Sequence, residues 1–371
     1  MIRLPEKVRK TLEKAVNEIK TKEEVYGIGL FGSWSRGDAE TSSDIDLFIL
    51  NKNGIEHEYV ERVIVNDLFV DLNFVPKSCI MGVIPPEIDQ KLYEMQILYD
   101  RDWSLTNTKL LMTKSYSSPE RVDIRTEAHV IDSDIYLSRA TSAFSREDFH
   151  SAQLFSKIAL ESMLKVIVEI ALMPISNSRF LGNLEVSMEK LGVQEFFSKY
   201  LEVTKLNSVD DAVVAEKLKL FKIIWDEISF ITKRNAKAFG SAYFKVRMRL
   251  KYYLNPAFLQ GMFLRAEALA GSGRVAEAVH CLNGVFVDLL ENYVWFRAST
   301  EKVKVDIATM LRFLKDLEKR SPKNYAKIIE FLGLSEANRQ SATRTIEETK
   351  RIMLKIRGER KALIKSCLLK S

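Results

Sequence analysis

Two carboxylates separated by one residue stand at the head of a strongly apolar stretch, in the run Asp44–Leu50. Residues two apart on a strand point to the same face, so Asp44 and Asp46 should share one face while Ile45, Leu47 and Ile49 face a core. Two carboxylates this close repel each other, so ionising both is unfavourable unless a cation lies beside them. We therefore expect a hard divalent cation such as Mg²⁺, which prefers carboxylate oxygen.

A third carboxylate on a neighbouring strand would complete a two-metal site for in-line phosphoryl displacement. Asp71 fits because it lies in the middle of a predicted strand, with its apolar neighbours on the opposite face. Asp67 has the same parity, but it falls in a predicted Asn66-Asp67 turn. Asp71 is therefore preferred over Asp67 as the third member.

The first ~110 residues alternate between helical and strand patterns. Pro5 is expected to begin a helix, and Pro86 is placed to begin another. Predicted strands cover Val25–Phe31, Asp44–Leu50 and Ile97–Asp100, and Val63–Val65 with Leu68–Val75 should form a hairpin. The charged run Glu56–Arg62, which contains His57, is typical of a solvated helix face. This pattern predicts a small mixed α+β domain over residues 1–118.

The loop after the first predicted strand can hold phosphates. Gly32 would let backbone N–H groups approach an anion, and Ser33 adds a hydroxyl and is expected to cap a helix. Arg36 continues the same turn, and a helix N-terminus there would favour anions. Trp34 could stack on a base, although packing is the favoured role. One loop could thus bind a triphosphate while the carboxylates bind its metals.

These residues together resemble a known signature. The pattern G-S-x-S-R-G-x5-S-D-I-D-L, from Gly32 to Leu47, resembles that of the polymerase β-type nucleotidyltransferase superfamily, in particular its minimal and aminoglycoside-modifying members. The resemblance implies transfer of a nucleoside monophosphate from a nucleoside triphosphate, with ATP the expected donor, and release of pyrophosphate. It further implies that Asp44, Asp46 and Asp71 bind Mg²⁺ or Mn²⁺, that Ser33 binds phosphate, and that Asp71 is a candidate general base.

After about residue 119 the strand patterns end and long amphipathic helical stretches follow, which predicts all-α helical bundles over 119–250 and 251–371. A weak internal repeat aligns Ala152 with Ala278. The alternative is chance similarity between two amphipathic helix pairs. The expected roles are an acceptor-binding lid and a homodimer surface. The apolar stripes Leu160/Leu164/Ile167 and Val285/Leu289/Tyr293 are expected to bury against other helices.

The helical region also resembles, more faintly, the HEPN domains that accompany minimal nucleotidyltransferases. HEPN ribonucleases use an Arg and a nearby His, but Phe239 stands where the His after Arg234 would be. Phe cannot shuttle a proton as imidazole can. The pairs Arg146/His150 and Arg274/His280 match the spacing or the neighbouring residues only in part. A HEPN-type RNase and a catalytically weak nucleotide- or RNA-binding module therefore stay as alternatives to the transferase.

Composition constrains the partners only loosely. The net charge of +6 over 371 residues permits an anionic partner, including RNA, without requiring one. The three cysteines are not spaced as a metal site or a disulfide framework, which predicts reduced thiols and a cytoplasmic location. No apolar run is long enough to span a membrane, so no membrane partner is expected. The acceptor could be a small molecule, a protein side chain or an RNA end.

Overall fold

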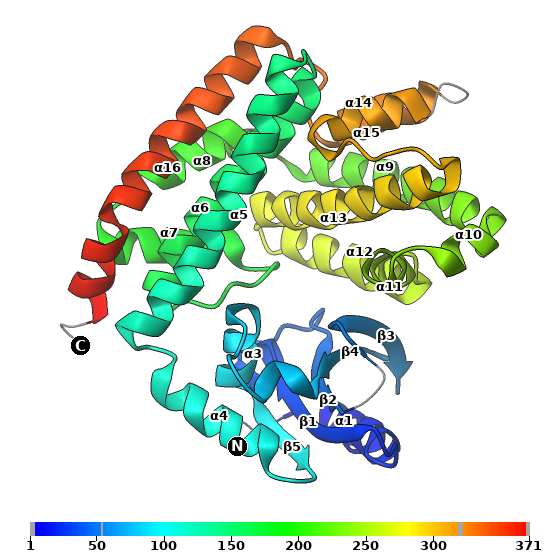
Figure 1. Ribbon diagram of the computed structural model, residues 1–371, viewed down its shortest axis with the longest axis vertical. Helices are drawn as coiled ribbons and strands as arrows, with labels where there is room; N and C mark the ends of the chain where they lie inside the picture. Colours follow the sequence, from blue (N-terminus) through cyan, green and yellow to red (C-terminus); the bar gives the residue numbers. More distant parts are fainter. Residues whose placement is uncertain (1–3, 53–54, 318–321, 369–371) are drawn as a thin grey trace. The chain divides into compact units, whose positions relative to one another are not determined.

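The computed structural model describes residues 4–52, 55–317 and 322–368. The chain forms two compact units (Figure 1). Unit 1 joins Met1–Ser118 to the later segment Tyr243–Arg265, and unit 2 comprises Pro119–Ala242 and Ala266–Ser371. The predicted limits 119–250 and 251–371 do not match this division, because residue 250 lies inside a helix of unit 1 and the remaining helices cluster together.

Unit 1 is the expected small α+β domain with a two-helix addition from the distant segment. Its strands are β1 (Val25–Phe31), β2 (Ile45–Asn51), β3 (Tyr59–Val65), β4 (Leu68–Pro76) and β5 (Gln96–Asp100). Its α-helices are α1 (Glu6–Ile19), α2 (Ser33–Arg36), α3 (Asp89–Glu94), α4 (Ser104–Ser115), α11 (Phe244–Tyr253) and the first part of α12 (Pro256–Gly271). Short 3₁₀ turns cover Lys77–Ile80 and Pro86–Ile88.

The five strands form one mixed sheet in the order β3-β4-β2-β1-β5. Strands β2 and β4 run parallel, whereas the other neighbouring pairs are antiparallel. The β2–β4 register places Asp46 directly opposite Asp71. The predicted hairpin is confirmed, with Asn66 and Asp67 both at positive φ in the turn between β3 and β4.

One face of this sheet is apolar and is covered by α1. The alternate residues of β2 and β4 join apolar side chains of α1 in a single buried cluster: Val8, Leu12, Ala15, Ile19, Ile45, Leu47, Ile49, Val70, Leu72 and Phe74. Trp34 packs against the same cluster, in keeping with the preferred packing role. The parity argument is therefore confirmed, because the neighbours of Asp46 and Asp71 point into this core.

Strand β3 begins four residues before the predicted strand, at Tyr59. The prediction that the run Glu56–Arg62 is a helix face was wrong. Its second half pairs with β4, and Tyr59 stacks on Phe74 with ring centroids 4.8 Å apart. In a strand, Tyr59, Glu61 and Val63 point to one face, and Val60 and Arg62 point to the other. The charged residues in this run hid the two-residue period that would have predicted the strand.

Unit 2 is entirely helical in its described residues. Its helices are α5 (Pro119–Ser145), α6 (Phe149–Ile170), α7 (Phe180–Leu191), α8 (Glu195–Thr204), α9 (Asp211–Arg234), α10 (Ala236–Ser241), the end of α12, α13 (Val275–Glu301), α14 (Met310–Leu317), α15 (Pro322–Phe331) and α16 (Arg339–Leu368), with 3₁₀ turns at Leu206–Ser208 and Ile307–Thr309.

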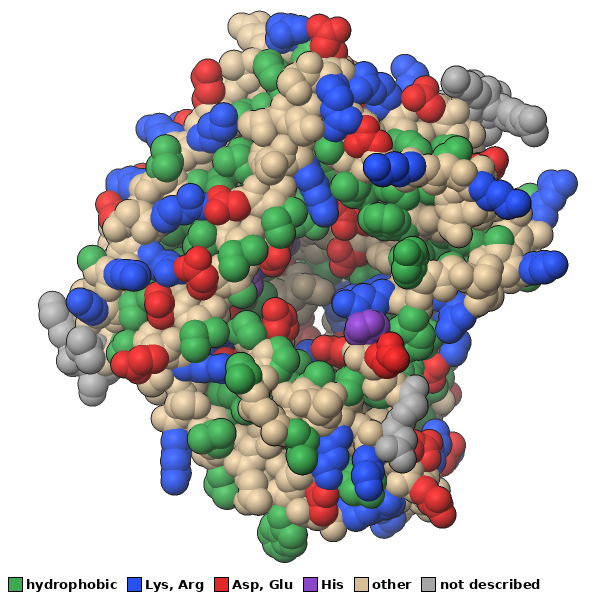
Figure 2. Space-filling view, viewed as in Figure 1, with side chains coloured by type: hydrophobic (Ala, Val, Ile, Leu, Met, Phe, Trp, Pro, Cys, Tyr) green, Lys and Arg blue, Asp and Glu red, His purple; other side chains and the backbone are tan. Residues whose placement is uncertain are grey.

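Helix α6 is the centre of unit 2, buried on almost every side and packed against α5 and α16. Asp148 begins it by accepting a hydrogen bond from Ser151 N. On the visible face of unit 2, basic and acidic side chains are mixed and do not form a single basic patch (Figure 2). In the part of the chain that is described, no helix is both long and apolar enough to cross a membrane. The internal duplication stays a prediction.

Candidate active site

The three predicted carboxylates come together at one edge of unit 1. Asp44 immediately precedes β2, Asp46 is the second residue of β2, and Asp71 lies in β4 opposite Asp46. All three lie on the sheet face away from the α1 core. Asp67 lies in the β3–β4 turn, four residues along the chain from Asp71, so the preference for Asp71 over Asp67 agrees with the register.

An arginine that sequence reasoning did not identify lies between two of these carboxylates. Arg62 in β3 donates from Nε to Asp71 Oδ1 at 2.6 Å and from Nη2 to Asp71 Oδ2, the paired geometry that suits a guanidinium and a carboxylate. The same Nη2 also bonds Asp44 Oδ2. The side chain of Arg62 is only 3% exposed, so its charge depends on these two partners.

Aromatic rings and a close helix hold this guanidinium in place. Its central carbon lies 5.3–5.7 Å from the ring centres of Phe69, Tyr252 and Phe258, within cation–π range. A side-chain Cβ at Gly261 in α12 would lie 2.8 Å from Arg62 Nη1, so glycine is what allows α12 to approach. Arg62 is therefore a fixed part of the site.

The distant segment also reaches the carboxylates directly. Tyr252 at the end of α11 donates its hydroxyl to Asp71 Oδ2 at 2.8 Å, and Arg265 in α12 donates from Nη2 to Asp44 Oδ1. Asn255 donates to the backbone oxygen of Arg62 at 2.9 Å, which anchors the connection between the two helices. Arg265 is 22% exposed, far more accessible than Arg62.

These contacts divide the charges unequally among the three acids. Burial opposes ionisation of Asp44, but Arg265 and Arg62 outweigh it and lower its pKa. Burial raises the pKa of Asp71 despite Arg62. Burial, and after it the charges of Asp44 and Asp71, hold the pKa of Asp46 well above its usual value. Two guanidinium groups thus balance two carboxylates, and Asp46 is the acid without its own cation.

Asp44, Asp46 and Asp71 offer carboxylate oxygens, which are the ligands that hard divalent cations prefer. Asp46 also has no cation of its own, so a metal ion could balance its charge. In this conformation, however, no three His, Cys, Asp or Glu side chains of the described residues are arranged to hold a metal. Arginines occupy both oxygens of Asp44. Asp44 and Asp46 could share an ion only after Arg265 turns away, so the metal assignment stays a prediction.

The predicted phosphate loop is a tight turn beside Asp46. Gly32 has φ 75°, a conformation that favours glycine, and a Cβ there would lie 2.6 Å from Asp46 Oδ2. Glu94 at the end of α3 accepts from Gly32 N at 2.7 Å and from Arg36 Nη1 at 2.8 Å. The backbone N–H of Gly32, which was predicted to bind phosphate, thus donates to the Glu94 carboxylate instead.

The local helix differs from the expectation in one respect. Helix α2 has only four residues, and Gly32 is its N-cap, so the prediction that Ser33 caps it was wrong. Ser33 is its first residue, and its hydroxyl makes no hydrogen bond with the described part of the chain. A helix this short contributes little dipole. Any anion here would depend on individual donors such as Ser33.

Tyr252, Arg265 and Arg62 were missed for different reasons. Arg62 lies in a run whose charges favoured a helix, although the alternation beginning at Tyr59 was a usable strand signal. Tyr252 and Arg265 lie in amphipathic helical sequence far from the motif. No local pattern distinguishes them from ordinary surface residues, and only the fold brings them to the carboxylates.

The histidines of unit 2 all have structural partners. His280 contacts Tyr200 Oη at 3.0 Å and stacks on Phe180, His150 contacts Tyr325 at 3.1 Å, and His129 lies 3.6 Å from Glu169. Phe239, which occupies the position expected for a HEPN histidine, packs edge-on against Phe296. His280 is buried among these partners, and RNase activity has no support from these contacts.

Comparison with known proteins supports the motif-based assignment. The family described as "Nucleotidyltransferase domain" matches residues 12–101. A solved structure of a nucleotidyltransferase-like protein from Exiguobacterium sibiricum is similar at 12% identity, with a TM-score of 0.32 over 83% of this chain and 91% of that one. No curated protein matches the chain. The family match ends before the helical unit, so the HEPN resemblance stays a prediction. The chain therefore carries a nucleotidyltransferase domain at residues 12–101.

Proposed function

We propose that the protein is a metal-dependent nucleotidyltransferase that moves a nucleoside monophosphate from a nucleoside triphosphate, ATP in the first instance, to a hydroxyl acceptor. The observation that carries this is the register pairing of Asp46 with Asp71 beside the Gly32 turn. It supports a site in which two carboxylates and a glycine turn adjoin each other. The acceptor is a small molecule, a protein or an RNA.

In this reaction the acceptor oxygen forms a bond to the α-phosphorus, and the bond from that phosphorus to the bridging oxygen of pyrophosphate breaks. Asp44, Asp46 and Asp71 would hold divalent ions, which neutralise charge developing on the phosphate oxygens. Ser33 would donate its hydroxyl to a phosphate oxygen. Arg36 would become available to the triphosphate if the phosphates displace Glu94 from the Gly32 turn.

The acceptor hydroxyl must also lose its proton, and Asp71 is the candidate base. Both of its oxygens accept hydrogen bonds from Arg62, and Oδ2 accepts a third from Tyr252. Donors of this kind favour the ionised carboxylate, although burial leaves the pKa of Asp71 raised. Asp71 could therefore take the proton only if one donor turns away, and Tyr252 is the more easily displaced of the two, since Arg62 is bound on several sides.

The test is transfer itself. Full-length protein is incubated with each α-labelled nucleoside triphosphate, Mg²⁺ and a cell lysate, and labelled products are identified by mass spectrometry. Wild type should label an acceptor and release pyrophosphate, whereas Asp46→Asn should do neither and keep its fold. Asp226→Asn, which alters an exposed ion pair with Lys222 on α9, is the matched control. Equal labelling by Asp46→Asn and wild type would refute the proposed site.

The alternative is a nucleotide-binding module with weak catalysis. The observation that favours it is the pairing of Asp44 and Asp71 with arginines, which supply positive charge without a metal. Such a module would bind a triphosphate equally well with EDTA present. Strict dependence of nucleotide affinity on Mg²⁺, measured by calorimetry, would favour the transferase.

A further inference from the structure

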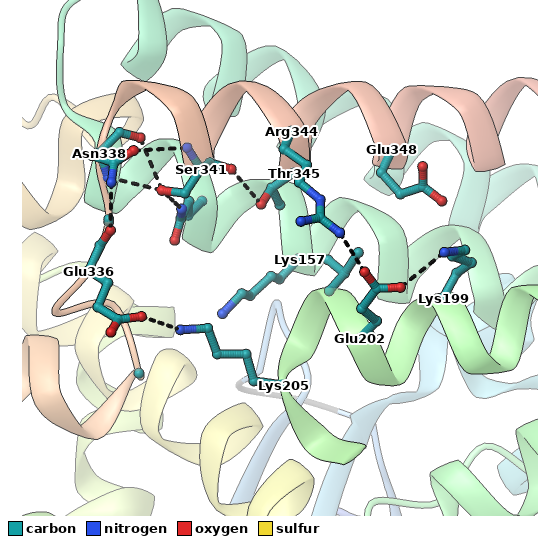
Figure 3. Close-up of a pocket in the computed structure, with 14 residues that line it drawn as sticks. Lys157, Lys199, Glu202, Lys205, Glu336, Asn338, Ser341, Arg344, Thr345 and Glu348 are labelled. Atoms are coloured by element: carbon teal, nitrogen blue, oxygen red, sulfur yellow. Dashed lines mark hydrogen bonds and ion pairs between the residues drawn. The ribbon is translucent and has the colours of Figure 1, made fainter. Parts of the chain in front are cut away.

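Unit 2 contains a cavity of about 600 Å³ that is remote from the carboxylates in sequence and lies wholly within the helical unit. It is bounded by α6, by α8 with the residue that follows it, and by the start of α16 (Figure 3). Its volume is within the range of small-molecule sites. Most of the side chains that line it are polar or charged, and their charges are unevenly paired.

Lys157 of α6 is the central feature of this cavity. Its side chain extends into the space in Figure 3, and it makes no hydrogen bond or ion pair with the described residues. Burial, and after it the neighbouring ammonium of Lys205, lower the pKa of Lys157 to about 8. A partly buried cation without a counter-ion is energetically unfavourable, so its position calls for an anionic partner.

A second ammonium nearby also lacks an acidic partner. Lys217 of α9 donates to Asn283 Oδ1 at 2.9 Å and to the backbone oxygen of Phe331, both neutral acceptors. Burial, and after it the charge of Lys157, lower its pKa to about 7. Neither lysine pairs with a carboxylate in the described chain, so positive charge on Lys157, beside the cavity, is uncompensated. A bound anion would compensate it and would favour the protonated form of both lysines.

The rim of the cavity carries cations that can be redirected. Lys205 pairs with Glu336 at 3.2 Å and Arg344 pairs with Glu202 at 2.6 Å, and both pairs are well exposed. Exposed pairs of this kind contribute at most about 1 kcal/mol, so a stronger anion can replace the carboxylates. The hydroxyl of Ser341, in the first turn of α16, already accepts hydrogen bonds from Gln153 Nε2 at 2.6 Å and from Asn338 N at 3.0 Å.

We propose that this cavity binds the phosphate group of a small phosphorylated molecule, with Lys157 contacting the phosphate and Lys205 and Arg344 closing over it from the rim. Phosphate is favoured over a single carboxylate because it carries more negative charge and has more oxygens for Lys157, Lys205 and Arg344 to contact. The remaining volume and the polar lining would accommodate a hydroxyl-rich remainder, such as a sugar. The site is independent of the nucleotidyltransferase chemistry.

The test uses full-length protein and inorganic phosphate as the probe, at constant ionic strength. Calorimetry and thermal unfolding should show saturable binding and a phosphate-dependent rise in Tm in wild type. Lys157→Met should weaken binding at least tenfold, while Lys157→Arg should stay within about threefold of wild type. Lys355→Met is the matched control, because it removes an exposed lysine of α16 that pairs with Glu195 outside the cavity.

Three results would overturn the proposal. One is the absence of saturable phosphate binding in wild type, which needs no variant to fold. Another is binding that persists in Lys157→Met but is lost in Ser33→Ala, since the phosphate would then lie at the Gly32 turn. The third is equal affinity for succinate and phosphate, which would show that the cavity does not select the phosphate group.

Discussion

Tyr252 donates its hydroxyl to Asp71 across 181 residues of chain, at 2.8 Å. The contact joins α11 to a carboxylate of the nucleotidyltransferase motif, and Lys251 beside it pairs with Glu61 of β3 at 2.7 Å. The segment 243–265 is therefore part of the fold of unit 1 and of its candidate site. Its side chains decide which oxygens of the carboxylates are available.

The hydrogen bond of Tyr252 should be measurable as stability. Tyr252→Phe should lower the free energy of unfolding by roughly 1.5–3 kcal/mol, the usual contribution of a hydrogen bond to a charged group. Urea denaturation checks it, with Tyr243→Phe as control, since Tyr243 is 79% exposed on the same segment. Equal loss in both variants would mean that the Asp71 contact contributes nothing specific.

Arg265 should compete with a metal for Asp44. Arg265→Gln removes a charge from Asp44 Oδ1, so the affinity for Mn²⁺, measured by electron paramagnetic resonance, should rise several-fold. Lys251→Met provides the comparison, because it removes a charge of the same segment that contacts Glu61 instead. An unchanged Mn²⁺ affinity in Arg265→Gln would show that Arg265 does not limit access.

Arg62 should behave differently because it is buried. Arg62→Met leaves two enclosed carboxylates without their cation and should cost about 3–5 kcal/mol of unfolding free energy. Added Mn²⁺ should restore more stability to this variant than to wild type, since a divalent ion can supply the missing charge. Arg9→Met, which alters an exposed pair on α1, should show neither effect. Thermal unfolding without Mn²⁺ measures the loss of stability in Arg62→Met, and the same measurement with Mn²⁺ shows how much of it is restored.

The Gly32 turn should not tolerate a side chain. Gly32→Ala places a Cβ against Asp46 and requires a positive φ of an L-residue, which costs about 1 kcal/mol or more and should displace Asp46. Nucleotide affinity by calorimetry should fall with it. Gly82→Ala, where an added Cβ meets nothing within 4 Å, should leave both quantities unchanged. Wild-type affinity in Gly32→Ala would exclude the turn from nucleotide binding.

The lowered pKa of Lys157 predicts how stability depends on pH. Its pKa falls from the reference value of 10.5 to about 8 on folding, so the unfolded chain binds more protons between these values. Stability should therefore rise with pH across that window. Lys157→Met should be more stable than wild type below pH 8, by on the order of 3 kcal/mol, and the difference should vanish towards pH 10.5. Chemical denaturation at a series of pH values checks the slope, and a constant difference would contradict it.

The sequence predicted the parts of the site that depend on local pattern. Strand parity placed Asp44, Asp46 and Asp71 on one face, and the Asn66-Asp67 turn set the register of the β3–β4 hairpin. The cations could not be predicted in the same way. Charge on Glu61 and Arg62 hid a strand. Arg265 lies in α12, 221 residues after Asp44, and reaches it because the preceding helix α11 packs on β3. Long-range packing of this kind has no local signature.

The discontinuity of unit 1 has a consequence for synthesis. The ribosome delivers β1 to β5 early, but Tyr252 and Arg265 emerge only after the 124 residues of 119–242 have been made. Until then Asp71 and Arg62 lack the contacts with segment 243–265, and this face of the nascent sheet is exposed to solvent. Such late closure of contacts distant in sequence slows folding. Unit 1 should thus reach its final form only in the last third of translation, after residues 119–242 have been made.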